Sequence, residues 1–146
     1  MTVTVVTDSA AALPADVAER HGIRVVPLVL HVGDDRYRDG ELSLEELVAR
    51  FDEPVSTAAP SPGEFLRVIA EAREAGPVVV LTVAAGISST HDVARLAAKE
   101  VDEEILVLDT GTAAGAQALV VIAAAEAAAR GADAAEVAEV ATEVAG

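Results

Sequence analysis

Three hydroxyl side chains follow the most apolar stretch of the sequence. Residues 78–83, Val-Val-Val-Leu-Thr-Val, do not alternate between apolar and polar, which is typical of a strand buried on both faces. A segment of small residues, 84–86, comes next, and Ser88, Ser89 and Thr90 then stand where a helix is expected to begin. Strand, small-residue loop and hydroxyl-rich helix start are typical of anion sites in open parallel sheets. The sequence therefore predicts an anion site within residues 77–91.

Two other stretches resemble catalytic motifs. Asp109-Thr110-Gly111 matches the triplet of aspartic proteases and loosely resembles the phosphoaspartate motif of phosphatases, but its spacing is one residue short of the latter. Aspartic proteases are all-β, whereas this triplet leads into an expected helix, so Asp109 and Thr112 are instead predicted to cap that helix. The segment 86–89 has the serine of a nucleophile elbow and lacks its second glycine. An enzyme is therefore not expected.

Metal, nucleic-acid and membrane sites are not indicated either. The histidines at positions 21, 31 and 91 fall on different expected elements, and the sequence has no cysteine. A net charge of −15, from 25 acidic and 10 basic residues, repels phosphate backbones. No uncharged apolar run reaches the roughly 18 residues of a membrane span, and no signal-peptide pattern is present. We expect a cytoplasmic protein without a metal or other cofactor.

Strands alternate with helices along the 146 residues, which suffice for one domain. The composition is 52% hydrophobic and 2% aromatic, so the core is expected to consist of aliphatic residues and alanine. This order predicts an α/β fold with a mainly parallel sheet and helices on both faces, a Rossmann-like three-layer arrangement. The expected strands are 2–7, 24–32, 78–83 and 104–108, with a hairpin over 29–38; the expected helices are 14–21, 43–51, 61–75, 91–101, 113–130 and 134–145.

Local signals refine this arrangement. Pro27 predicts an edge position or an irregularity within the second strand, and the proline-rich segment 53–60 is predicted to be an irregular loop. Capping boxes start two helices, Ser43 with Glu46 and Ser61 with Glu64. Because ligands bind at the carboxyl ends of parallel strands, the predicted site lies among the loops that follow positions 7, 32, 83 and 108.

Four stretches together resemble the DegV family of bacterial fatty-acid-binding proteins. They are Val-Val-Thr-Asp-Ser-Ala at 5–10, Ser-Thr-Ala-Ala-Pro-Ser-Pro-Gly-Glu-Phe at 56–65, Gly-Ile-Ser-Ser-Thr-His at 86–91 and Val-Leu-Asp-Thr at 107–110. The second is the most specific, because Thr57, Pro60, Ser61, Pro62 and Phe65 align with the family pattern Thr-Ser-Gln-Pro-Ser-Pro-x-x-Phe. Within the third, Ser89 and His91 replace a glycine and a tyrosine of the pattern.

The resemblance implies a non-enzymatic protein that holds a long-chain fatty acid and presents it to a partner such as a fatty acid kinase. Family members hold the carboxylate with the threonine of the second stretch and the serine of the third, which are Thr57 and Ser88 here. The full set of candidate carboxylate ligands is Thr57, Ser88, Ser89, Ser61, Thr90 and Ser9.

Family members also carry a second, C-terminal domain that closes over the ligand. Residues 1–146 are therefore expected to form a single N-terminal α/β domain of DegV type without that C-terminal domain. Self-association through the face that the second domain normally covers is a further expectation. The alternative function is an interaction or scaffold module that kept the fold and lost the ligand.

Overall fold

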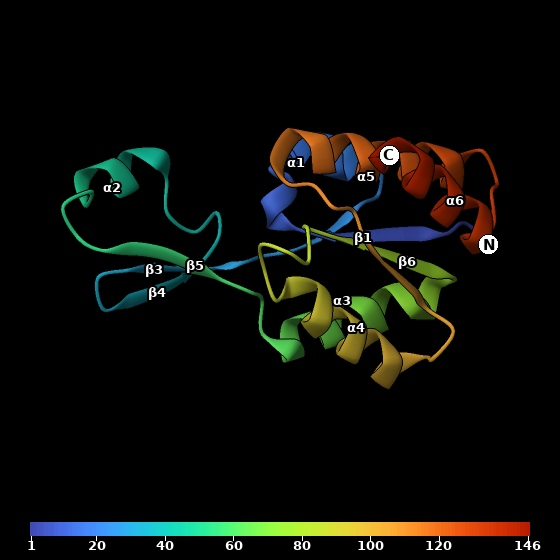
Figure 1. Ribbon diagram of the computed structural model, residues 1–146, viewed down its shortest axis with the longest axis horizontal. Coiled ribbons are helices and arrows are strands. Elements are labelled where there is room, and N and C mark those ends of the chain that lie inside the picture. Colours follow the sequence, from blue (N-terminus) through green and yellow to red (C-terminus); the bar gives the residue numbers. More distant parts are fainter.

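The computed structural model describes residues 1–146 and contains two sheets (Figure 1). A four-stranded parallel sheet of order β2-β1-β6-β7 lies at the centre of the body, and a three-stranded antiparallel sheet of order β4-β3-β5 projects from it. Residues 29–58, which contain the second sheet and helix α2, are called the arm. The strands are β1 Thr4–Asp8, β2 Arg24–Val26, β3 Val29–Val32, β4 Asp35–Arg38, β5 Val55–Ala58, β6 Val78–Thr82 and β7 Leu106–Asp109.

Helices cover both faces of the parallel sheet, as predicted. Figure 1 shows α1, α5 and α6 on one side and α3 and α4 on the other, while α2 lies on the arm. The helices are α1 Ala15–Arg20, α2 Leu44–Ala49, α3 Pro62–Ala75, α4 Thr90–Val101, α5 Ala114–Ala129 and α6 Ala134–Ala145, with a 3₁₀ turn at Ser9–Ala11. None of them is both long enough and apolar enough to cross a membrane.

Strand β6 is the centre of the core, because it is buried along its whole length. The side chains of Val79 and Leu81 belong to the apolar cluster beneath α5 and α6. Those of Val78 and Val80 belong to the cluster beneath α3 and α4. Alternate side chains thus fill opposite cores, which explains why the sequence of this strand is apolar without interruption. Each such side chain stabilises the fold by about 1.5–3 kcal/mol through burial.

The expected strand 24–32 is divided at Pro27 into two strands of different sheets. Strand β2 ends at Val26 in the parallel sheet, and β3 begins at Val29 in the arm. Pro27 has no N–H for a sheet ladder, and the N–H of Leu28 donates to Ser9 Oγ at 2.8 Å instead of to a strand. The loop after Val32 therefore does not lie at the carboxyl edge of the parallel sheet, which corrects the prediction.

The arm contains the expected hairpin and the expected helix α2, and one strand that was not expected. The hairpin over 29–38 is confirmed, because Val29 pairs with Arg38 and Val32 with Asp35. The prediction of an irregular loop over 53–60 is wrong, because Val55–Ala58 forms β5 and pairs antiparallel with β3. The prolines of this segment, at 54 and 60, flank the strand and do not interrupt it.

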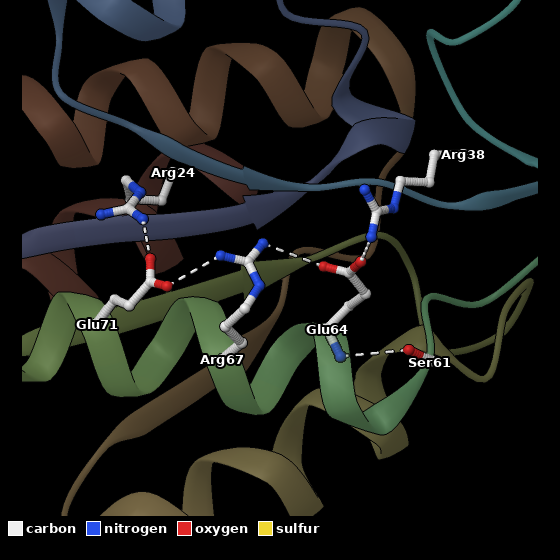
Figure 2. A network of polar contacts seen from close by, with 6 residues as sticks. All are labelled: Arg24, Arg38, Ser61, Glu64, Arg67 and Glu71. Carbon is white, nitrogen blue, oxygen red and sulfur yellow. Dashed lines mark hydrogen bonds and ion pairs between the residues drawn. The ribbon is translucent and has the colours of Figure 1, made fainter.

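A chain of ion pairs joins the arm to the body (Figure 2). Arg38 of β4 pairs with Glu64 at the start of α3. Arg67 forms ion pairs with Glu64 and Glu71 at 3.2 and 3.0 Å. Glu71 also forms an ion pair with Arg24 of β2 at 2.8 Å. The carboxylate of Glu64 is thereby drawn away from its own helix start, so only the serine half of the predicted capping box is formed. Within this network, the Arg38–Glu64 ion pair is the contact that links the arm to α3.

The last two helices pack on one another over the sheet. Asp133 and Glu136 form a capping box at the start of α6. Of the predicted valine stripe, Val137 is fully buried and Val140 packs against the core, whereas Val144 is 48% exposed. Helix α5 begins without a side-chain cap, so the predicted caps Asp109 and Thr112 do not serve it.

Candidate functional site

The carboxyl ends of β1, β6 and β7 meet at one edge of the parallel sheet. They end at Asp8, Thr82 and Asp109, and the loops that follow form one surface beside the arm. Parallel strands direct their connecting loops to the same edge, and this is where open α/β sheets bind ligands. The stretch predicted to hold an anion, 77–91, contains the loop after β6 and lies at this edge.

A buried carboxylate organises this edge. Asp8 is completely buried, and its Oδ2 accepts a hydrogen bond from the N–H of Val83 at 2.8 Å. Its Oδ1 accepts from the N–H of Ala10 at 3.0 Å and from Nε2 of Gln117 at 3.1 Å. Burial raises the pKa of the Asp8 carboxyl, while these donors act in the opposite direction. One side chain thus holds the loops after β1 and β6 against α5.

The loop after β6 is fixed from its other side by the loop after β7. Asp109 Oδ1 accepts hydrogen bonds from the N–H groups of Ala85 and Gly111 at 3.1 and 2.8 Å. The carbonyl of Thr112 accepts from the N–H of Ala84 at 2.9 Å. Asp109 and Thr112, predicted to cap a helix, therefore position the candidate anion-binding loop.

A pocket of about 430 Å³ lies between this loop and the arm. Three of the predicted site residues line it: Thr57 from β5, and Ser88 and Ser89 from the start of α4. None of its lining residues carries a charge, so the polar groups that line it are dipolar. The other lining residues are small or aliphatic: Ala10, Leu28, Ala58, Ala59, Val83, Ile87 and Ala113.

Several polar groups of the pocket have no hydrogen-bond partner within the chain. Thr57 Oγ1 forms no hydrogen bond within the chain, and neither do the backbone N–H groups of Ser88 and Ser89. Ser88 Oγ is bonded only to the residue behind it, Thr90. Hydroxyls and N–H groups at the start of a helix can direct their positive ends toward an anion, and the helix dipole adds about 0.3–1 kcal/mol. This arrangement can hold a carboxylate.

The other predicted ligands do not line this pocket. Thr90 is completely buried behind Ser88. Ser9 Oγ accepts from the N–H of Leu28 at 2.8 Å and fixes the junction between body and arm. Ser61 Oγ accepts from the N–H of Glu64 at 3.2 Å and caps α3 (Figure 2). The structure therefore brings together only part of the predicted set.

Replacing Ser61 by alanine tests the capping role. We expect Ser61→Ala to lower the free energy of unfolding by about 1 kcal/mol, because the N–H of Glu64 loses its acceptor at the start of α3. Denaturant unfolding followed by circular dichroism measures this, with the exposed Ser56→Ala as the control. An unchanged stability would contradict the capping role.

Sequence reasoning missed the residues that position the site. Gln117 is the one polar side chain in the first two turns of the apolar helix α5, and this contrast marks it as a residue that needs a buried partner. That partner, Asp8, is 109 positions away in the chain. The apolar wall formed by Leu28 had no sequence signal, because it depends on the break at Pro27.

Residues 2–145 match the family model of the DegV family. A DegV domain-containing protein of Streptomyces coelicolor is 40% identical over 134 residues, which are 88% of this chain and 48% of that protein. The structure of a DegV family protein from Thermus thermophilus, described as fatty acid binding, has a TM-score of 0.90 at 33% identity and covers 99% of this chain and 54% of its own.

A third relative is the fatty acid kinase (Fak) B3 protein of Streptococcus pneumoniae, whose structure is loaded with linoleic acid. Its TM-score is 0.77 at 26% identity, over 98% of this chain and 54% of that protein. The chain spans about half the length of these relatives. Since the family model matches nearly all of its residues, the chain belongs to the DegV family.

Proposed function

We propose that this chain binds a long-chain fatty acid without catalysing a reaction, and that it holds the carboxylate in the pocket between arm and body. The observation that carries the proposal is that Thr57 of the arm and Ser88 of the body line one pocket with free donors. The two related structures contain or are described as binding fatty acids, which supports the same class of ligand.

The chemistry of the pocket suits a carboxylate that is held by dipoles. No cation lines the pocket, so the negative charge would be met by hydroxyl and backbone N–H donors. Hydrogen bonds to a charged group contribute about 1.5–3 kcal/mol each, roughly twice the value for neutral pairs. Thr57, Ser88 and the free N–H groups beside Ser88 are sufficient in number to satisfy a carboxylate on both oxygens.

The aliphatic wall suits the beginning of an acyl chain. Leu28, Val83 and Ile87 line the same pocket, and Ile87 is 71% exposed. Burial of an acyl chain contributes about 0.8 kcal/mol per methylene, so most of the affinity would come from the chain and the hydroxyls would set its orientation.

Lipid extraction tests the function directly. The purified chain is expected to release a long-chain fatty acid that mass spectrometry identifies, or to take up added oleate. Protein that is empty and also fails to bind oleate or palmitate would contradict the proposal and favour the scaffold module as the function.

The hydroxyl roles are tested by substitution. We expect Thr57→Val and Ser88→Ala each to weaken oleate binding about tenfold or more, because each removes one charge-assisted hydrogen bond. Fluorescence competition with a fatty-acid probe measures the affinities. The matched control is Ser61→Ala, because Ser61 lies outside the pocket. This variant should bind oleate with the affinity of the wild type. Equal affinity of all variants would contradict the assignment of the carboxylate site.

Domain organisation and partners belong to the same proposal. Residues 1–146 would act as the N-terminal, carboxylate-binding domain of DegV type, and a fatty acid kinase would be the partner that receives the acid. Self-association through the face that the second domain of the family normally covers is checked by sedimentation with and without oleate. A single monomeric species under both conditions would contradict self-association.

A further inference from the structure

Thr90 lies behind the pocket and touches it only through Ser88. We propose that Thr90 is a positioning residue that directs the hydroxyl hydrogen of Ser88 into the pocket. The inference rests on the proposed function, because it concerns how the same site selects a carboxylate.

The geometry joins two hydroxyls and one N–H. Ser88 Oγ and Thr90 Oγ1 are 2.7 Å apart, and the backbone N–H of Thr90 also donates to Ser88 Oγ at 3.1 Å. Thr90 has no exposed surface, whereas Ser88 is half-buried and lines the pocket. Ser88 Oγ is the one hydrogen-bond partner of Thr90 Oγ1.

The positions of the hydrogens follow from counting donors and acceptors. Water does not reach Thr90 Oγ1, so its hydrogen must go to Ser88 Oγ or remain buried without an acceptor, which is unfavourable. A serine oxygen has two acceptor positions. The hydroxyl and the N–H of Thr90 occupy both, so Ser88 can donate its own hydrogen only away from Thr90. The pocket is the side that remains open.

The direction in which Ser88 donates its hydrogen favours one class of ligand head group. Ser88 acts as a donor to the pocket and not as an acceptor, so a carboxylate, which only accepts, is favoured over a head group that must donate. Successive hydrogen bonds also polarise one another, so the bond from Thr90 strengthens the donor character of Ser88. Thr90 therefore contributes to carboxylate affinity without contacting the carboxylate.

Substitution of Thr90 separates this role from a merely structural one. Thr90→Val keeps the shape and the N–H and removes the hydroxyl, while Thr90→Ser keeps the hydroxyl and serves as the conservative variant. Oleate and oleyl alcohol are the two probes, and their dissociation constants are measured for the wild type, both Thr90 variants, Ser88→Ala and the double variant Ser88→Ala with Thr90→Val. Thermal unfolding of each protein reports on folding.

We expect Thr90→Val to weaken oleate binding about three- to tenfold, to weaken oleyl alcohol binding less, and to have no further effect in the Ser88→Ala background. Thr90→Ser, which keeps the hydroxyl, should bind oleate with the affinity of the wild type. Equal losses for both probes, or additive losses in the double variant, would show a structural role and overturn the inference. Wild-type affinity in Thr90→Val, while Ser88→Ala binds weakly, would overturn it and leave the proposed function intact. Absence of oleate binding by the wild type would overturn both.

Discussion

Replacing Phe65 by alanine is expected to lower the free energy of unfolding by about 3–5 kcal/mol, a large share of the roughly 5–15 kcal/mol of a typical domain. Phe65 is completely buried on α3 and packs in the core that includes Val6 and Val80 of the sheet and Ala94 of α4. Truncation removes the largest side chain of this core and leaves a cavity that the surrounding strands and helices cannot close.

The matched control for this prediction is the same substitution at Phe51, which is 74% exposed on the arm. We expect Phe51→Ala to change stability by less than about 0.5 kcal/mol. Urea unfolding followed by circular dichroism measures both variants. Similar effects at the two positions would show that the core beneath α3 is not packed as described.

Replacing Asp8 by asparagine is expected to lower the free energy of unfolding by about 1–3 kcal/mol at neutral pH, although the substitution removes a buried charge. Asp8 accepts hydrogen bonds from Val83, Ala10 and Gln117, and all three partners are donors. The amide group of asparagine necessarily directs its own NH₂ at one of them, which leaves two donors facing each other without an acceptor.

The pH dependence of the same variant follows from the raised pKa of Asp8. Burial makes the folded state bind this proton more tightly than the unfolded state, whose ordinary pKa is 3.8. The stability linked to this proton is therefore fully present below 3.8 and is lost as the pH rises through the folded-state pKa. Asparagine does not titrate, so the stability difference between wild type and Asp8→Asn should shrink as the pH rises through that interval.

Urea unfolding at several pH values checks both parts of the Asp8 prediction. The control is Asp34→Asn, because Asp34 is exposed on the arm hairpin and forms no ion pair or side-chain hydrogen bond. A stability difference that grows with pH would contradict the assignment of the raised pKa to Asp8.

Local sequence patterns predict much of the fold. The uninterrupted apolar stretch of β6 predicts a strand between two cores, and its side chains fill both. Ser61 and Pro62 predict the start of α3, because a capping side chain and a fixed φ act within one turn. These signals depend only on neighbours in the sequence, so they predict the strand and the helix start without the tertiary structure.

Local patterns did not predict the three-stranded sheet of the arm. The segment 24–32 reads as one strand, and the segment 53–60 reads as a loop, because sequence alone does not say which strands pair. Pairing of β3 with both β4 and β5 satisfies their backbone groups in a separate sheet, and the break at Pro27 allows the chain to leave the first sheet. Tertiary pairing therefore decided that Thr57 lies on a strand of the arm.

The sequence by itself determined the α/β class, the buried strand and the hydroxyl-rich turn at 88–90, because these follow from local periodicity and capping. Only the tertiary structure decided which hydroxyls meet. It placed Thr57 and Ser88 at one pocket, put Thr90 behind Ser88, and gave Ser9 and Ser61 structural bonds elsewhere. The physical reason is that a ligand site joins residues from distant segments, and their separation depends on sheet pairing and on where the arm leaves the parallel sheet.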